Sequence, residues 1–486
     1  MNSDGATRER RRHSLQGQVQ GVGFRPFVFA LARRLGLTGF VRNTPEGVLA
    51  EVQGPKEALA AFSRDLEAKR PPRSRITARW EERIPLLERE KDFRIALTTH
   101  GSGHTLLVSP DIALCADCRA EMDDPDNRRQ GYAFTNCTNC GPRYTVTRAM
   151  PYDRSSTSMA CFALCPECRR EYEDPGDRRF HAQPNACPVC GPKLWLAYPV
   201  GADNPAPPEG SAALATAAKL LRKGGILALK GLGGFQLACA ADQAETVARL
   251  RKHKARPHKP FAVMVADLEA ARRIARPGKT AGALLAGPEH PIVLCPLRDK
   301  HPLAEGLAPD LSLIGLMLPN TPLHHALLKA YANLGADPPA LVMTSGNREG
   351  EPICLGNREA LAALGNIADA FLLHDRDILV RVDDSVLCPL PGGKVLFLRR
   401  ARGYVPRPLS LSDKASQSYQ SFHDDLTTPL QIRRTAGFPV VLGTGADLKN
   451  TICLTKGTDA FVSQHIGDLD NPETAAFQRE VIAHLG

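Results

Sequence analysis

The sequence lacks the features that mark membrane-spanning, secreted and nucleic-acid-binding proteins. No stretch of its 486 residues approaches about 18 consecutive apolar residues, which excludes a transmembrane helix. No apolar segment follows the basic N-terminal run, so we expect no secretory signal, a cytoplasmic location and no membrane partner. Aromatic residues make up only 6% of the chain, and no aromatic RNA-binding motif or recognition-helix pattern occurs, which disfavours a nucleic-acid partner.

Two common nucleotide-binding motifs are also missing. The sequence G-x4-G-K-[ST] does not occur, which excludes a P-loop enzyme. The glycine-rich residues 230–235 lack the spacing and the following acidic residue of a dinucleotide-binding fingerprint, so we reject that interpretation. The composition is globular, with 43% hydrophobic and 23% charged residues, and the length suits roughly three domains. The net charge of +10 is compatible with several pockets for phosphorylated small molecules.

Cysteine, in contrast, is abundant. Nine of the 14 cysteines lie within residues 108–195, and reduced thiols or metal ligands explain them better than disulfides in a chain without a secretory signal. The segments that begin at Ala113 and Ala163 align without a gap, and each contains C-x2-C-x18-C-x2-C. This spacing predicts two structural Zn²⁺ ions and leaves open whether the pairs combine within or across the repeats. The predicted ligands are Cys115, Cys118, Cys137, Cys140, Cys165, Cys168, Cys187 and Cys190. Cys161 and His181 lie outside the repeated spacing, and we interpret them as packing residues.

Residues 13–98 alternate strand-like and helix-like patterns. Their order, strand–helix–strand–strand–helix–strand, predicts a ferredoxin-like domain, with residues 92–97 as the closing strand. Residues 17–25, GQVQGVGFR, place a glycine-rich loop between the first strand and the first helix. Backbone N–H groups, a helix N-terminus and the fork of Arg25 together suit an anion. The predicted phosphate loop comprises Gln20, Gly21, Val22, Gly23 and Phe24.

The third region, residues 200–408, alternates helical patterns with buried-strand runs and predicts an α/β domain. Basic, hydroxyl and amide side chains gather in the loops at the strand ends. Such loops suit a triphosphate, so we expect ATP, accompanied by Mg²⁺, as a substrate. The candidate nucleotide-binding residues are Lys230, Lys254, Arg256, Lys259, Thr344, Ser345, Asn347, Arg381, Ser385, Arg399 and Arg402.

Several of these motifs resemble known families. The sequence GQVQGVGFRPF closely resembles the acylphosphatase signature, and GFVRNTPEGVLAEVQG resembles its second motif. The resemblance implies that Arg25 binds the phosphate and that Asn43 orients the attacking water. The sequences LALKGLGGFQLACAA, RPHKPFAVMV, LPNTPLHHALL, VMTSGNREGEPI and RARGYVP resemble the YrdC-type domain of the HypF family of hydrogenase-maturation carbamoyltransferases. GADLKNTICL with SQHIGDLDNPET resembles the start of that family's ASKHA-type transfer domain.

The resemblance to HypF implies a reaction sequence. Carbamoyl phosphate is hydrolysed to carbamate at the first site, and the YrdC-like domain joins carbamate to ATP as carbamoyl adenylate. The transfer domain then passes the carbamoyl group to the C-terminal cysteine of HypE, the protein partner. The family's histidine-rich metal motif is absent from this chain. We therefore expect it to make carbamoyl adenylate without loading HypE, and we expect the apolar face after about residue 430 to lack partners.

Motifs and resemblance together predict a multidomain α/β and α+β chain. Its expected parts are a disordered basic tail (1–12), an acylphosphatase-like domain (13–98), a tandem four-cysteine zinc module (108–195), a YrdC-like domain (200–408), a linker (409–436) and the truncated start of a transfer domain (437–486). Two other functions stay open. One is a threonylcarbamoyl-adenylate synthase for tRNA modification, against which the first two modules argue. The other is a zinc-dependent binding module without ATP chemistry.

Overall fold

The computed structural model describes residues 8–71, 73–99, 108–199, 207–411, 440–457 and 459–485. Contacts divide the chain into two compact units. The first comprises residues 1–109 and 136–191, and the second comprises residues 110–135 and 192–486. The predicted cysteine module 108–195 is therefore shared between the two units. No helix among the described residues is both long and apolar enough to cross a membrane.

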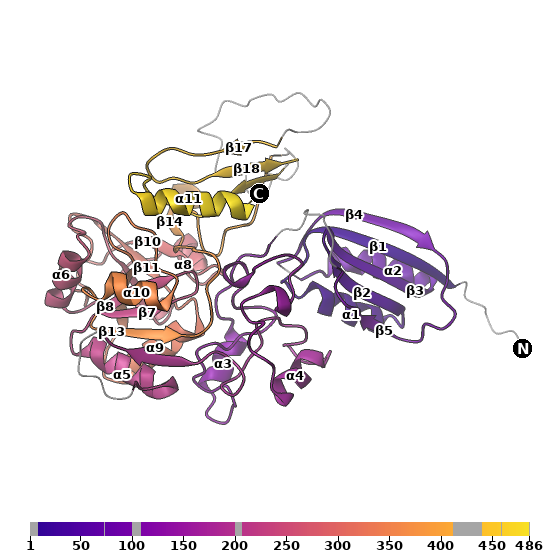
Figure 1. Cartoon of the computed structure of the whole chain (residues 1–486), viewed down its shortest axis with the longest axis horizontal. Coiled ribbons are helices and arrows are strands. Elements are labelled where there is room, and N and C mark those ends of the chain that lie inside the picture. The colour runs from indigo at the N-terminus through magenta and orange to yellow at the C-terminus, as the bar shows by residue number, and fades with distance from the viewer. Residues whose placement is uncertain are drawn as a thin grey trace, which may run out of the picture. The chain divides into compact units, whose positions relative to one another are not determined.

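The first unit contains a five-stranded sheet in the order β4-β1-β3-β2-β5. All neighbouring strands are antiparallel except β2 and β5, which are parallel. Helices α1 and α2 share one hydrophobic core with the sheet, as expected for a ferredoxin-like fold (Figure 1). The elements are β1 (Arg8–Gln18), α1 (Phe24–Arg34), β2 (Thr38–Thr44), β3 (Gly47–Pro55), α2 (Lys56–Ala68), β4 (Arg75–Ile84) and β5 (Phe93–Ile95).

Two details of the predicted order are wrong. The fourth strand of the motif is β4, and the predicted closing strand at 92–97 instead contributes β5, at the opposite edge of the sheet. The side chains of β4 are half-buried or exposed, as befits an edge strand, and polar residues alternate with Ile76, Ala78 and Trp80. Its charges pair with those of β1, as in the Arg11–Glu81 and Arg12–Glu82 ion pairs. Residues 8–12, predicted as part of a disordered tail, form the start of β1.

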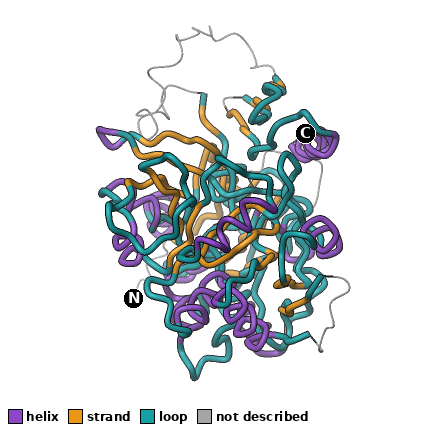
Figure 2. Tube along the Cα trace, turned by 90° about the vertical axis from the view of Figure 1, so that its left-hand side faces the viewer, coloured by secondary structure: helices purple, strands orange, loops and turns teal. Residues whose placement is uncertain are grey.

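The cysteine-rich segment is built mostly from loops, which Figure 2 draws in teal. Its two α-helices begin directly after the first cysteine of each repeat, so the repeats adopt the same local structure. The helical elements are α3 (Ala116–Asp123), two short 3₁₀ turns (Tyr144–Val146 and Arg154–Ser156) and α4 (Pro166–Glu173).

The second unit is organised around a ten-stranded mixed sheet in the order β15-β14-β10-β11-β9-β12-β8-β7-β13-β6. Every residue of the central strands β7 and β8 is buried, so both faces of the sheet are covered. The strands are β6 (Leu194–Ala197), β7 (Leu227–Lys230), β8 (Phe235–Ala240), β9 (Ala262–Val265), β10 (Ile292–Pro296), β11 (Leu313–Met317), β12 (Ala340–Ser345), β13 (Ala370–His374), β14 (Val386–Pro389) and β15 (Val395–Arg399).

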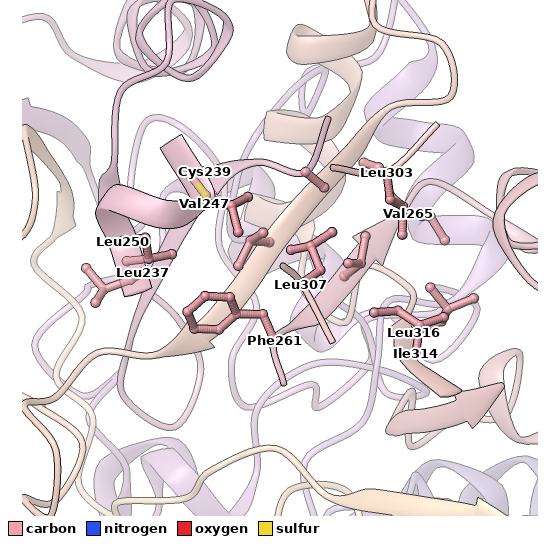
Figure 3. Close-up of a cluster of buried hydrophobic side chains, with 14 of the residues drawn as sticks. Leu237, Cys239, Val247, Leu250, Phe261, Val265, Leu303, Leu307, Ile314 and Leu316 are labelled. Atoms are coloured by element: carbon pink, nitrogen blue, oxygen red, sulfur yellow. The ribbon is translucent and has the colours of Figure 1, made fainter. Parts of the chain in front are cut away.

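Helices α6, α7, α8 and α10 contribute side chains to one core cluster against this sheet. Figure 3 shows part of the cluster, where Phe261 and Leu307 lie among Leu237, Val247 and Leu316. Helices α5 and α9 pack against each other. The helices are α5 (Gly210–Arg222), α6 (Ala244–His253), α7 (Leu268–Ile274), α8 (Lys279–Leu285), α9 (Pro322–Ala332) and α10 (Asn357–Leu364).

A small antiparallel sheet in the order β16-β19-β18-β17 and one helix complete the second unit. Ile452, Ile466, Phe477 and Val481 form their own buried cluster, so the prediction that this segment's apolar face lacks partners is wrong. The strand β16 lies within the predicted linker 409–436, whose residues 412–436 lie outside the described part of the chain. The elements are β16 (Leu409–Ser410), β17 (Leu442–Gly443), β18 (Cys453–Lys456), β19 (Asp459–Val462) and α11 (Pro472–Leu485).

Candidate functional sites

The predicted phosphate loop connects β1 to the N-terminus of α1. Gly21 and Gly23 have φ angles of 70° and 74°, a left-handed conformation that favours glycine. Val22 and Phe24 are buried, so only their backbone groups can face a ligand in the loop. The side chain of Gln20 is held by hydrogen bonds within the protein. Its Nε2 donates to the carbonyl oxygens of Thr44 (3.0 Å) and Gly47 (2.8 Å), which ties the loop to the β2–β3 hairpin.

Arg25 stands in the first turn of α1 and lines a pocket together with the loop. The pocket is completed by residues from the cysteine-rich segment, including Thr138, Arg143 and Tyr152. The guanidinium of Arg143 donates from Nε to the carbonyl oxygen of Gly21 at 2.7 Å, which fixes the loop from outside the ferredoxin-like domain. A basic fork at a helix N-terminus beside exposed N–H groups can bind a phosphate group.

His181 also lines this pocket, although the sequence pattern suggests a packing residue. The imidazole ring of His181 contacts the rings of Tyr172 and Phe180. Its Nδ1 is buried without a hydrogen-bond partner among the described residues. Burial, and secondarily the charge of Arg25, lower the pKa of His181 to about 4, so its side chain is neutral at pH 7. Cys161, interpreted in the same way, is exposed and is therefore not a packing residue.

The eight predicted zinc ligands form two groups, and each group belongs to one repeat. Within each group, the sulfur atoms all lie within 4.8 Å of one another. This answers the question that the spacing leaves open, because the pairs combine within the repeats and not across them. None of the cysteines in the described part of the chain forms a disulfide bond.

The second group has the dimensions of a zinc site. The Sγ atom of Cys187 lies 3.7 Å from that of Cys165 and 3.8 Å from that of Cys190. Four sulfurs at about 2.3 Å from one Zn²⁺ in a tetrahedron lie about 3.8 Å apart, whereas a disulfide needs about 2.05 Å. Burial raises the pKa of Cys187, but N–H donors of Cys190 and Val189 outweigh it and bring the value down to about 7. In the first group, Cys137 and Cys140 are 3.9 Å apart.

Five of the candidate nucleotide-binding residues gather where α6 ends and β12 ends. The ammonium of Lys254 donates to the carbonyl oxygens of Ser345 (2.6 Å) and Asn347 (2.8 Å). Arg256 donates to the hydroxyl of Thr344 at 3.3 Å. Burial lowers the pKa of Lys254 to about 7 and that of Arg256 to about 10. A cluster of partly desolvated cations beside hydroxyl and amide groups can hold a triphosphate.

The other candidates are not all in this cluster. Lys259 is exposed, and the side chain of Ser385 is buried and donates to the carbonyl oxygen of Arg402 at 3.0 Å. Arg399 forms an ion pair with Asp383, and Arg381 forms one with Glu359. These contacts give Ser385 and Arg381 structural partners within the protein.

Lys230 is buried at the end of β7, and its hydrogen bond is separate from those that Lys254 makes. Its ammonium donates to the carbonyl oxygen of His374 at 3.1 Å. Burial lowers the pKa of Lys230 to about 8.

A polar pocket in the second unit contains residues that the sequence reasoning missed. Gln236, Asn320, His324 and Asp384 line it, and of the predicted residues it includes only Arg402. These side chains form a chain, in which Arg402 donates to Asp384 (2.7 Å), Gln236 donates to Asp384 (2.7 Å) and His324 contacts Gln236 (2.8 Å). Burial lowers the pKa of His324 to about 3, so the imidazole is neutral. Gln236 lies in LALKGLGGFQLACAA, and Asn320 and His324 lie in LPNTPLHHALL, two sequences that resemble the YrdC-type domain. Residue types alone did not assign these side chains to a site, because the partners of each come from separate strands and loops.

Comparison with known proteins matches each of these regions to a family. An acylphosphatase model matches residues 12–95, and a model described as telomere recombination matches residues 219–401. The model described as the HypF finger matches residues 114–147 and 164–197, and the HypF Kae1-like domain matches residues 437–486. The carbamoyltransferase HypF2 of Cupriavidus necator is 48% identical to this chain over 98% of its length. The chain belongs to the HypF family.

Other HypF proteins agree with this assignment. The carbamoyltransferase HypF of Rhizobium leguminosarum bv. viciae is also 48% identical over 98% of the chain. A crystal structure of full-length HypF in a phosphate- and nucleotide-bound form has 40% identity and a TM-score of 0.87, and covers 99% of the chain. The chain spans 57% of the length of the two HypF relatives and 58% of that crystallised chain. The predicted acylphosphatase, cysteine-finger and YrdC-like regions are thereby confirmed.

Proposed function

We propose that this HypF-family chain carries out two consecutive reactions. In the first unit, carbamoyl phosphate and water give carbamate and phosphate. In the second unit, carbamate and ATP, with Mg²⁺, give carbamoyl adenylate and pyrophosphate. The observation that carries the proposal is that one chain combines an acylphosphatase loop containing Arg25 with the cationic cluster of Lys254 and Arg256. Hydrolysis of carbamoyl phosphate alone would not explain the cationic cluster, and adenylation alone would not explain the loop before Arg25.

For the hydrolysis, Arg25 and the N–H groups of the glycine loop would bind the phosphoryl oxygens. Asn43 would orient a water for attack on phosphorus, and the bond between phosphorus and the carbamate oxygen would break. Carbamate leaves as an anion of a weak acid, so no strong general base or acid is needed. Charge stabilisation and a positioned water are sufficient for such a reaction.

For the adenylation, the positive charges of Lys254 and Arg256, beside the hydroxyl of Thr344, would attract the triphosphate of ATP. The phosphate- and nucleotide-bound crystal structure of a HypF supports this assignment of ligands. In the full-length family the carbamoyl group would pass to the C-terminal cysteine of HypE, and we propose that step only for the whole protein. The two cysteine groups would each hold one structural Zn²⁺, since all-cysteine sites leave no open position for chemistry.

An isotope-exchange assay tests the proposal. Carbamoyl phosphate should make the exchange of labelled pyrophosphate into ATP possible, and threonine with bicarbonate should not replace it. Exchange that requires threonine would identify a threonylcarbamoyl-adenylate synthase instead. The absence of any exchange, in protein that contains its metal, would favour a zinc-dependent binding module. An Arg25→Ala variant should lose hydrolysis of carbamoyl phosphate but keep its zinc content and ATP binding.

A further inference from the structure

Two residues between the cysteine repeats contact the side chains on which hydrolysis would depend. Tyr152 and Asp153 belong to the same compact unit as the acylphosphatase-like domain, and Tyr152 lines its pocket. The backbone N–H of Tyr152 donates to Oε1 of Gln20 at 2.9 Å. We propose that Tyr152 and Asp153 belong to the hydrolase site and position Arg25 and Asn43 for the reaction. This inference rests on the proposed hydrolysis of an acyl phosphate.

Asp153 fixes the guanidinium of Arg25. Nη2 of Arg25 donates to Oδ1 of Asp153 at 2.9 Å, and Oδ2 of Asp153 accepts a hydrogen bond from the hydroxyl of Thr98. Both carboxylate oxygens are therefore held. No other hydrogen bond of this guanidinium occurs among the described residues, so its remaining N–H groups are free to bind phosphate oxygens. A long side chain that is already oriented loses less entropy when it binds a ligand.

Tyr152 fixes the carboxamide of Asn43. Nδ2 of Asn43 donates to the carbonyl oxygen of Tyr152 at 3.3 Å. A carbonyl oxygen can pair only with the N–H side of the amide, so this contact determines which way the amide is turned. Oδ1 of Asn43 is buried and has no hydrogen-bond partner among the described residues. It is therefore available to accept a hydrogen bond from the attacking water, which is the role that the acylphosphatase resemblance assigns to Asn43.

The Arg25–Asp153 ion pair has a second possible consequence, in which the carboxylate competes with phosphate for the guanidinium. The contact with Thr98 argues for positioning, because an anchored carboxylate stays where it is when phosphate arrives. The two roles predict opposite effects of removing the carboxylate. Loss of a positioning group weakens phosphate binding, whereas loss of a competing anion strengthens it.

The test uses Asp153→Ala, Asp153→Asn and Asp153→Glu in the full chain. We expect Asp153→Ala to raise both the KM for carbamoyl phosphate and the inhibition constant of inorganic phosphate by about tenfold. Asp153→Glu should recover part of the loss, because the longer side chain keeps the charge. The control is Glu173→Gln, since the side chain of Glu173 is 64% exposed and forms an ion pair with the surface residue Arg169 at 3.8 Å. Unchanged or tighter phosphate inhibition in Asp153→Ala would overturn the inference.

Two further measurements keep the result interpretable. Zinc content and ATP binding should be normal in all Asp153 variants, which separates a local effect from misfolding. Asp153→Asn preserves the size of the side chain if Asp153→Ala does not fold. Calorimetric binding of inorganic phosphate does not depend on turnover. If the wild-type chain fails to hydrolyse carbamoyl phosphate, the proposed function fails. The positioning role of Asp153 is then still decided by whether Asp153→Ala weakens phosphate binding.

Discussion

The ammonium nitrogen of Lys254 lies 2.7 Å from Oδ1 of Asn347. This contact joins the end of α6 to the loop after β12, which is 93 residues away in the sequence. The same ammonium donates to the backbone carbonyl oxygens of Ser345, the last residue of β12, and of Asn347, so all three of its N–H groups are used. Lys254 therefore shapes the end of β12 and the loop that follows it, and a deprotonated Lys254 would leave one of these oxygens without a donor.

Binding of ATP should depend on pH through Lys254. Burial is the main cause that lowers the pKa of this lysine to about 7, and the charge of Arg256 adds to it. The protonated form favours an anionic ligand, so affinity for ATP should be highest below pH 7 and should fall as the pH rises from 7 to 9. ATP would in turn raise the pKa, so binding near pH 8 should take up a proton. Titration calorimetry in two buffers of different ionisation enthalpy measures this uptake.

Lys254→Met and Lys259→Met provide the matched pair for this experiment. The first should weaken ATP binding and remove its pH dependence between 7 and 9. The second changes an exposed lysine five residues further along the chain and should preserve that pH dependence. Retention of the pH dependence in Lys254→Met would assign it to another group.

Asn43→Ala should reduce turnover of carbamoyl phosphate much more than it changes KM. Asn43 is buried, and its unpartnered Oδ1 would position water while Arg25 binds the phosphate. Misplacement of an attacking group can cost about 100-fold in rate, so we expect a loss of kcat of that order. Steady-state kinetics with phosphate as a competitive inhibitor measure both quantities. An unchanged kcat, or a rise in KM alone, would contradict the water-positioning role.

The chain should contain two Zn²⁺ ions, and Cys168→Ser should reduce this number to one. Cys168 is fully buried within the second group of ligands. The binding energy of a structural zinc site is about 10 kcal/mol or more and contributes to folding, so the variant should also unfold at a lower temperature. Cys161→Ser is the control, because Cys161 is exposed and belongs to neither group. Metal analysis that finds iron, or less than about one zinc per wild-type chain, would exclude the zinc assignment.

Sequence reasoning could locate candidate sites where their residues lie close together in the chain. The cysteine spacing predicted the two groups of four sulfurs that the structure brings together. The glycine loop before Arg25 and the run from Lys254 to Arg256 are also short patterns, and the phosphate chemistry assigned to them stays a prediction. Sequence reasoning failed where residues meet through the fold. Asp153 contacts Arg25 from 128 positions away, and no motif surrounds it. Gln236 and His324, which are in contact, are likewise 88 positions apart, so the sequences around them do not show that they meet.

The strand order shows the same limitation for the fold. The order of helices and strands predicted the ferredoxin-like topology, but the choice between β4 and residues 92–97 depends on edge pairing. Residues 75–80 alternate in apolar and polar character, but the place of β4 beside β1 depends on cross-strand ion pairs, which the pattern of one strand does not reveal. The partners of the C-terminal segment were also missed, because Thr474 and Asn471 reach the carbonyl oxygen of Gly350 across a long separation in sequence.

Phe477→Ala should detach the C-terminal segment from the rest of the second unit without unfolding the main sheet. Phe477 is 5% exposed within a cluster of four buried residues, and the guanidinium of Arg381 lies 6.0 Å from the centre of its ring. Removing a buried phenyl ring costs about 3 kcal/mol or more, which is a large share of the stability of so small a core. Leu448→Ala is the control, since Leu448 is 69% exposed. Hydrogen exchange should be slow in α11 of the wild type and of Leu448→Ala, and fast in α11 of Phe477→Ala, with β7 and β8 unchanged. Fast exchange of α11 in the wild type would mean that the contacts of Phe477, Thr474 and Asn471 do not hold the segment in solution.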